Sequence, residues 1–314
     1  MQDADLGAAA DTNGDVPFPA SNPWNINISN TTAYPVDPNS SALIAHIGAN
    51  TPLHADWGTT SEEYGMPYMV VDSTQPLVNV TVSSSTGYPA DSDVFPMPIP
   101  ANAPIEGGSN YAASGGDGHV MVISRSPTTG HVQQLFELWH ARPQQGGSWT
   151  ADASAAFDIT SNNVRPTKAG QCDVTSADAA GLPIFPGLVR YDEAASGAIY
   201  HALRFTVSST RKAFVPPANH WASSNTSTSY PPMGMRVRLK ASYVIPSNFS
   251  TESKAILQAL KTYGMMVADN GSNWYISGDT DDQWSNSPVF SELSTVEGSN
   301  FEVIQMTGIV TSCQ

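Results

Sequence analysis

Carboxylate, imidazole and indole side chains fall close together between residues 115 and 140. Asp117 and His119 directly precede one apolar, β-prone run, and Glu137 and Trp139 lie at the end of the next. The turn between the runs, residues 126–130, contains proline and glycine, so the segment is predicted to be a β-hairpin. Because side chains alternate between the faces of a strand, His119, Glu137 and Trp139 share one face. An acid and an imidazole beside an aromatic ring indicate a site of chemistry.

The opposite face of this predicted hairpin is apolar. Val120 and Val122 on the first strand match Phe136 and Leu138 on the second. Such a face packs into a core. The two strands are therefore predicted to carry packing on one side and chemistry on the other.

Glycoside hydrolysis requires two carboxyl groups that flank the scissile bond. We predict Glu137 as one of them and Asp117 or Glu106 as the other, with His119 orienting the pair. Burial against an aromatic ring raises the pKa of a carboxyl group and suits it to the role of general acid. Glu106 lies beside two glycines, which let a ligand approach the backbone closely.

Further polar and aromatic residues are candidates for substrate binding. Asp56 is also a candidate for the second carboxylate, because an extended strand would place His54 and Asp56 on one face with Trp57 turned away. His201 and Arg204 face opposite sides of a regular strand, so one of the two reaches a shared site. The predicted substrate-binding residues are Asp56, His54, Trp57, Trp139, His201 and Arg204.

The same residues leave two other enzyme classes open. A polysaccharide lyase uses a His or Tyr base and a cation that neutralises a uronate, and His119, Tyr200, His201 and Arg204 supply these types. A metal-dependent enzyme is the second, because the pairs at 54/56 and 117/119 have chelating spacing. The sequence contains no standard metal motif, so we assign no metal ligand. We expect no cofactor except a structural Ca²⁺ held by loop carboxylates.

A non-enzymatic carbohydrate-binding or extracellular structural protein is the third class. The chain carries 13 basic and 28 acidic residues, for a net charge of −15. Nucleic acids and anionic membranes repel such a surface. No apolar run is long enough for a membrane span. The expected partner is therefore a neutral or weakly charged polysaccharide or oligosaccharide.

Two cysteines, Cys172 and Cys313, are predicted to form a disulfide that fixes the C-terminal tail. Disulfides persist in oxidising compartments. The start of the chain, residues 1–8, has the composition of a mature secreted N-terminus. Both features predict an extracellular protein.

Many short β-prone runs are separated by long loops rich in glycine and proline. The pattern predicts an all-β fold, an antiparallel β-sandwich or jelly roll. One helix is expected near 251–264, with Ser250 as its N-cap. Residues 1–40 are predicted to be an extended N-terminal arm, and residues 41–314 a single sandwich domain.

Three phrases resemble those of a widespread family of secreted, mostly bacterial proteins. The resemblance extends from about residue 20 over most of the chain. It implies secretion, and it carries no activity, fold or catalytic residue. The phrases are Ala180-Gly-Leu-Pro-Ile-Phe-Pro-Gly-Leu-Val-Arg-Tyr-Asp-Glu193, His201-Ala-Leu-Arg-Phe-Thr206 and Pro231-Pro-Met-Gly-Met-Arg-Val-Arg-Leu-Lys240.

Overall fold

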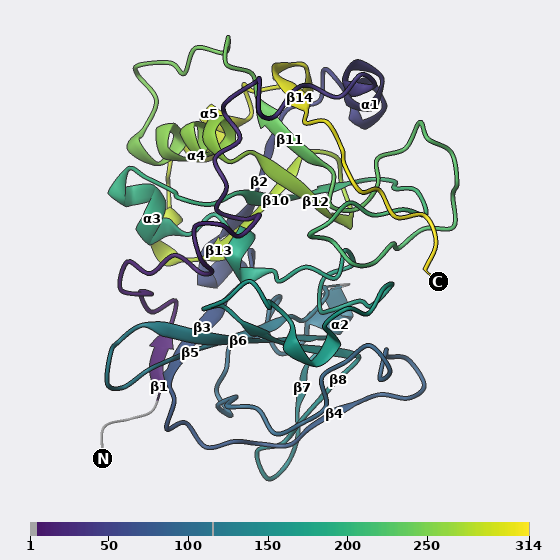
Figure 1. Cartoon of the computed structure of the whole chain (residues 1–314). Coiled ribbons are helices and arrows are strands. Elements are labelled where there is room, and N and C mark those ends of the chain that lie inside the picture. Colours follow the sequence, from purple (N-terminus) through teal and green to yellow (C-terminus); the bar gives the residue numbers. More distant parts are fainter. Residues whose placement is uncertain (1–4, 115, 314) are drawn as a thin grey trace.

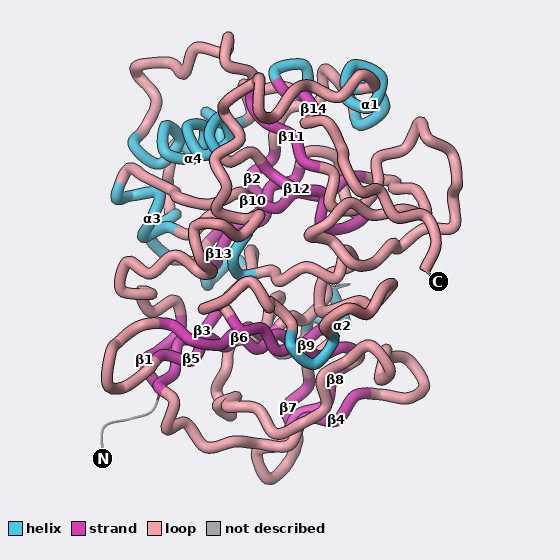
Figure 2. The backbone as a smooth tube through the Cα atoms, viewed as in Figure 1, coloured by secondary structure: helices cyan, strands magenta, loops and turns pink. Residues whose placement is uncertain are grey.

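Short strands in three sheets form the framework of the described chain (Figures 1 and 2). The computed structural model describes residues 5–114 and 116–313; the first four residues of the expected secreted N-terminus lie outside these ranges. The first sheet has the order β1-β3-β5-β6-β9. Its strands are β1 (Asp5–Ala8), β3 (Tyr68–Asp72), β5 (Val120–Arg125), β6 (Val132–Trp139) and β9 (Ala153–Asp158).

The second sheet has the order β14-β11-β12-β10-β13-β2, and a small third sheet has the order β4-β8-β7. The strands of the second sheet are β2 (His54–Gly58), β10 (Leu203–Val207), β11 (Arg236–Leu239), β12 (Met265–Asn270), β13 (Tyr275–Thr280) and β14 (Phe301–Val303). Those of the third are β4 (Val80–Val82), β7 (Arg142–Pro143) and β8 (Trp149–Ala151).

The prediction of a chain richer in strand than in helix is confirmed, but the sheets are mixed. β3 and β5 pair in parallel, as do β10 and β12, β13 and β2, and β4 and β8. Parallel neighbours require long crossover connections. The long loops that the sequence displays supply those crossovers, so a purely antiparallel arrangement is not what the chain adopts.

The predicted helix is α4 (Thr251–Thr262), and the Ser250 hydroxyl accepts a hydrogen bond from the Ser253 amide at 3.2 Å, as an N-cap does. With α1 (Ser40–Ile47), α3 (Tyr191–Ser196) and α5 (Val289–Leu293), it lies around the second sheet (Figure 1). A short α2 (Tyr111–Ser114) precedes β5.

None of the helices in the described ranges is long and apolar enough to cross a membrane. Single 3₁₀ turns are Thr60–Glu62, Pro166–Lys168, Phe185–Gly187, Asp282–Trp284 and Gly298–Asn300.

The β5–β6 hairpin has the predicted apolar face, but Glu137 pairs with Met121 and not with His119, which we expected to lie across from it. Val120 pairs with Leu138, and Val122 pairs with Phe136. This apolar face packs against the third sheet, where its contacts include Trp149. The opposite face belongs to the main core, which takes side chains from both large sheets. The first sheet is therefore covered on both sides.

Near the start of the chain, β1 pairs along the edge of β3. Phe18 and Trp24 of the arm are buried in the main core.

The predicted disulfide is present, with 5.7 Å between the Cα atoms of Cys172 and Cys313. The tail is thus covalently joined to the loop that follows residue 168.

Candidate functional site

The polar face of the hairpin lies between the two large sheets and not at an open surface. His119 is 3 % exposed. Its Nδ1 lies 2.5 Å from a Glu106 carboxylate oxygen, and its Nε2 lies 3.0 Å from the Ala177 carbonyl oxygen. Burial acts to lower the pKa of His119, but the Glu106 carboxylate outweighs it and the pKa rises to about 9. At neutral pH the imidazolium therefore donates to both oxygens.

Glu137 is fully buried, with no solvent-exposed surface. Its carboxylate accepts hydrogen bonds from the backbone amides of Ile184, at 2.9 and 3.0 Å, and Phe185, at 2.9 Å. Burial raises the pKa of Glu137 to about 7, although the two amides act in the opposite direction. We expected Glu137 and His119 to act together in an open cleft. In the structure, segment 177–185 covers this face of the hairpin, and both side chains hydrogen-bond to the backbone of that segment.

These two residues hold the two ends of segment 177–185, which carries a third ionisable group, Asp178. The Asp178 carboxylate accepts a hydrogen bond from Arg204 at 2.8 Å and one from the Ala180 amide at 2.8 Å. Arg204 also donates to the Ser277 hydroxyl at 2.7 Å. Arg204 and Asp178 are both almost fully buried. The first sheet thus anchors the segment, and the second sheet supplies the counter-charge.

Asp178 lies at a cavity of about 200 Å³, here called the aspartate cavity. Two more carboxylates line it: Asp117 precedes β5 of the first sheet, and Asp269 is near the end of β12 of the second. The Trp139 indole donates a hydrogen bond to Asp117 at 3.2 Å. The complete lining is Tyr88, Asp117, Trp139, Thr175, Ser176, Ala177, Asp178, Ala179, His220, Ala222, Asp269 and Asn270.

A break in strand register brings Asp178 and Asp269 to the same cavity. The β10–β12 ladder shifts after Phe205, so that Thr206 pairs with Asp269 and Ala268 is skipped. The Ala268 carbonyl accepts a hydrogen bond from the Ala180 amide at 3.0 Å instead. Bulges of this type commonly re-aim side chains beside functional sites.

The carboxylates of the aspartate cavity differ in their charge environment. Burial, and then the negative charge of Asp178, raise the pKa of Asp269 to about 7. Burial also raises the pKa of Asp178, but the Arg204 guanidinium favours its ionised form. Unequal environments of this kind allow neighbouring carboxyl groups to take the roles of acid and base.

Other predicted site residues lie elsewhere. The His54 imidazole is 3.1 Å from the Tyr64 hydroxyl, which donates to Asp56, so this pair does share a face of β2. Trp57 is fully buried and packs against Trp284, with ring centroids 5.4 Å apart. A sugar therefore cannot stack on Trp57, which corrects the expectation that it binds substrate.

His201 is likewise a buried residue, and its Nε2 lies 3.0 Å from a Glu193 oxygen. Glu193 also pairs with Arg190 at 2.7 Å. This cluster is apart from the aspartate cavity, whose lining includes neither His201 nor Glu193.

Of the predicted set, the structure brings Asp117 and Trp139 to the cavity and puts Arg204, His119 and Glu106 behind its wall. Sequence reasoning missed Asp178 and Asp269. The available signal was an aspartate at the end of an apolar strand, directly before the Asn270-Gly271 turn.

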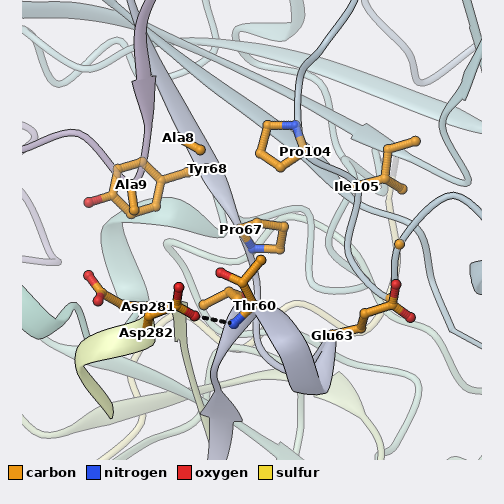
Figure 3. Close-up of a pocket in the computed structure, with 13 residues that line it drawn as sticks. Ala8, Ala9, Thr60, Glu63, Pro67, Tyr68, Pro104, Ile105, Asp281 and Asp282 are labelled. Atoms are coloured by element: carbon orange, nitrogen blue, oxygen red, sulfur yellow. Dashed lines mark hydrogen bonds between the residues drawn. The ribbon is translucent and has the colours of Figure 1, made fainter. Parts of the chain in front are cut away.

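A larger cavity, of about 490 Å³, lies by β1 and β3 (Figure 3). Asp281 and Asp282 stand on one side of it and Glu63 on the other, and Asp282 accepts a hydrogen bond from the Thr60 amide at 2.9 Å. Glu63 and Asp282 are exposed, and the only aromatic residue in the lining is the buried Tyr68. We therefore favour the aspartate cavity as the candidate site.

A metal-dependent enzyme was one of the classes that the sequence left open. Within residues 5–114 and 116–313, no group of three or more His, Cys, Asp or Glu side chains is arranged to hold a metal ion. The structural Ca²⁺ ion remains a prediction.

Comparisons with protein-family models, with curated proteins and with solved structures found no match to this chain.

Proposed function

We propose that the chain is a secreted glycoside hydrolase that acts on a neutral or weakly charged polysaccharide at the aspartate cavity. The observation that carries the proposal is that two carboxylates from different sheets, Asp117 just before β5 and Asp269 in β12, line one cavity beside an aromatic ring. Two carboxyl groups across a glycosidic bond are the requirement of this chemistry.

In the proposed reaction Asp269 is the general acid. Its pKa, raised to about 7, leaves a large fraction of it protonated near neutral pH, and it gives its proton to the glycosidic oxygen as the bond from that oxygen to the anomeric carbon breaks. Asp117 is the second carboxyl group, which activates water or attacks the anomeric carbon. Water supplies the hydroxyl of the new reducing end. Asp178 and Arg204 are positioning residues that set the charge around Asp269.

The rim of the cavity supports a sugar as the ligand. Trp139 is half-buried and Tyr88 is exposed, with ring centroids 6.1 Å apart. Aromatic rings offer an apolar face to a sugar and a polar edge to water. The net charge of −15 argues against an anionic polymer. The disulfide fits the extracellular location that the proposal includes.

The test is a panel of polysaccharides assayed for new reducing ends, with Asp269→Asn and Asp117→Asn as variants. Each variant should fold normally and lose roughly 10³-fold in rate, the scale of a positioned acid or base. Glu63→Gln, at the larger cavity, is the matched control and should keep full activity. Loss of activity in the control, with active aspartate variants, would move the reaction to the other cavity.

The products distinguish the remaining classes. Unsaturated sugars that absorb in the ultraviolet would identify a lyase. Retention on a polysaccharide with no product would identify a binding protein. Either result contradicts the hydrolase proposal.

A further inference from the structure

A third cavity, of about 420 Å³, lies across a wall from the aspartate cavity. The Ala180 carbonyl accepts hydrogen bonds from the amides of Asn219, at 2.9 Å, and His220, at 3.1 Å. This joins segment 175–183 to segment 216–222. Ala179 and His220 line the aspartate cavity, whereas Gly181 and Asn219 line the third one. The same two segments therefore separate the two cavities.

We call the third cavity the amide cavity, after Asn163, Gln171 and Asn219 in its lining. The side chains of these three residues make no hydrogen bond within the part of the chain that the structure describes. Asn163 and Gln171 are exposed, and Asn219 is half-buried. Three amide groups thus face a cavity with their donors and acceptors available.

The charge of the amide cavity differs from that of the other two. Among the described residues, its lining includes no Asp or Glu, although acidic residues outnumber basic ones by 28 to 13 in the chain. Arg165 lines the cavity but is paired with Asp93 at 3.0 Å. The Lys168 ammonium donates to the Ala90 carbonyl oxygen at 2.9 Å. The lining therefore presents mainly neutral polar groups.

Primary amides and neighbouring hydroxyl groups have complementary hydrogen-bonding geometry, because an amide has a donor and an acceptor side by side. Prolines at 183, 216 and 217 add apolar surface to the same lining. A sugar ring has hydroxyls on its edge and C–H groups on its face, so it matches both. Ligand sites commonly combine such an apolar surface with a few placed polar groups.

We propose that the amide cavity is a second saccharide site, which holds a neutral segment of the polysaccharide whose cleaved bond lies in the aspartate cavity. The inference rests on the proposed function, since it gives the substrate a second point of attachment. Two linked sites raise the affinity for long chains without raising it for short ones.

The test is calorimetric titration with neutral disaccharides and hexasaccharides of glucan, xylan and mannan, in an Asp269→Asn background that prevents turnover. The double variant Asn163→Ala/Gln171→Ala should bind the best hexasaccharide at least 10-fold more weakly than the background does. The matched control is Gln133→Ala/Gln134→Ala, which removes two exposed amides from β6.

Equal hexasaccharide affinity in the double variant and the control would overturn the proposal, as would tighter binding of an oligogalacturonate than of any neutral sugar. Absence of binding at millimolar sugar would do so too. The failure of the catalytic proposal looks different: the wild type would hydrolyse nothing, while the double variant still lost hexasaccharide affinity.

Discussion

The imidazole Nε2 of His119 lies 3.0 Å from the carbonyl oxygen of Ala177, the residue that precedes Asp178. On its other side the imidazole binds Glu106. Glu137, two positions from Trp139 on the neighbouring strand, holds the amides of Ile184 and Phe185. The hairpin thus fixes both ends of the segment that carries Asp178. In this arrangement the side chains of His119 and Glu137 hold the backbone of that segment in place.

His119→Leu removes both hydrogen bonds and leaves the buried Ala177 carbonyl oxygen and the half-buried Glu106 carboxylate without the imidazole donor. Each such loss costs about 1–3 kcal/mol, so the free energy of unfolding should fall. If His119 positions Asp178, kcat of the folded variant should also fall at least 10-fold with little change in KM. His119→Gln, whose amide can still donate to Ala177, should restore part of kcat. A kcat equal to that of the wild type in folded His119→Leu would reduce the role to stability alone.

Asp178→Asn should change the pH dependence of the proposed reaction. The negative charge of Asp178 helps to raise the pKa of Asp269 to about 7. An acid catalyst must be protonated, so kcat/KM of the wild type should decline as the pH rises through about 7. Removal of the neighbouring charge lowers the pKa of Asp269, and the decline should move to lower pH. The measurement is a profile of kcat/KM between pH 4 and 9.

The opposite shift, to higher pH, would show that Asp178 does not raise the pKa of the acid. Glu63→Gln is again the control, because Glu63 lines the other cavity. Its profile should superimpose on that of the wild type.

Arg204→Met should be strongly destabilising. Arg204 neutralises Asp178, which is only 1 % exposed, and loss of one partner of a buried ion pair typically costs about 3–5 kcal/mol. Asp178→Asn in the same chain removes the unpaired charge and should recover most of the loss. Urea denaturation of the single and double variants measures both effects. Equal stabilities of Arg204→Met and the double variant would show that the charge of Asp178 is compensated elsewhere.

Several elements were predictable because their signals are local. The alternation of Val120 and Val122 indicated the apolar face of the hairpin, and Ser250 marked the start of α4. The disulfide followed from the presence of only two cysteines. Each of these depends on a periodicity, a cap or a count that a single segment carries.

The sequence carried no such local signal for segment 177–185, which covers the polar face of the hairpin. Segment 177–185 is irregular, and its position depends on a carbonyl group at Ala177 and an amide group at Ile184 that any residue type other than proline provides. Asp178 and Asp269 are brought together by a register shift in the second sheet. Sequence periodicity reveals which face of a strand is polar, but it does not reveal whether a distant loop satisfies that face. The sequence therefore indicated Asp117 and Trp139, which line the aspartate cavity, but not Asp178 and Asp269.

Glu137 makes the stability of the chain dependent on pH. Its pKa is about 7 in the folded protein, against 4.5 for an exposed glutamate. The folded protein therefore keeps a proton that the unfolded chain releases, and the free energy of unfolding falls as the pH rises from about 4.5 to 7. For Glu137 alone the change is on the order of 3 kcal/mol. Burial also raises the pKa of Asp279 to about 7, which acts in the same direction.

Glu137→Gln separates this contribution from the others. A glutamine resembles the protonated carboxyl group, because its Oε1 can accept hydrogen bonds from both Ile184 and Phe185. The variant should match the wild type at pH 4.5 and be more stable than it at pH 8, which is unusual for a change at a fully buried position. Urea denaturation at the two pH values measures the difference. A variant that is less stable than the wild type by the same amount at both values would show that Glu137 is ionised throughout this range.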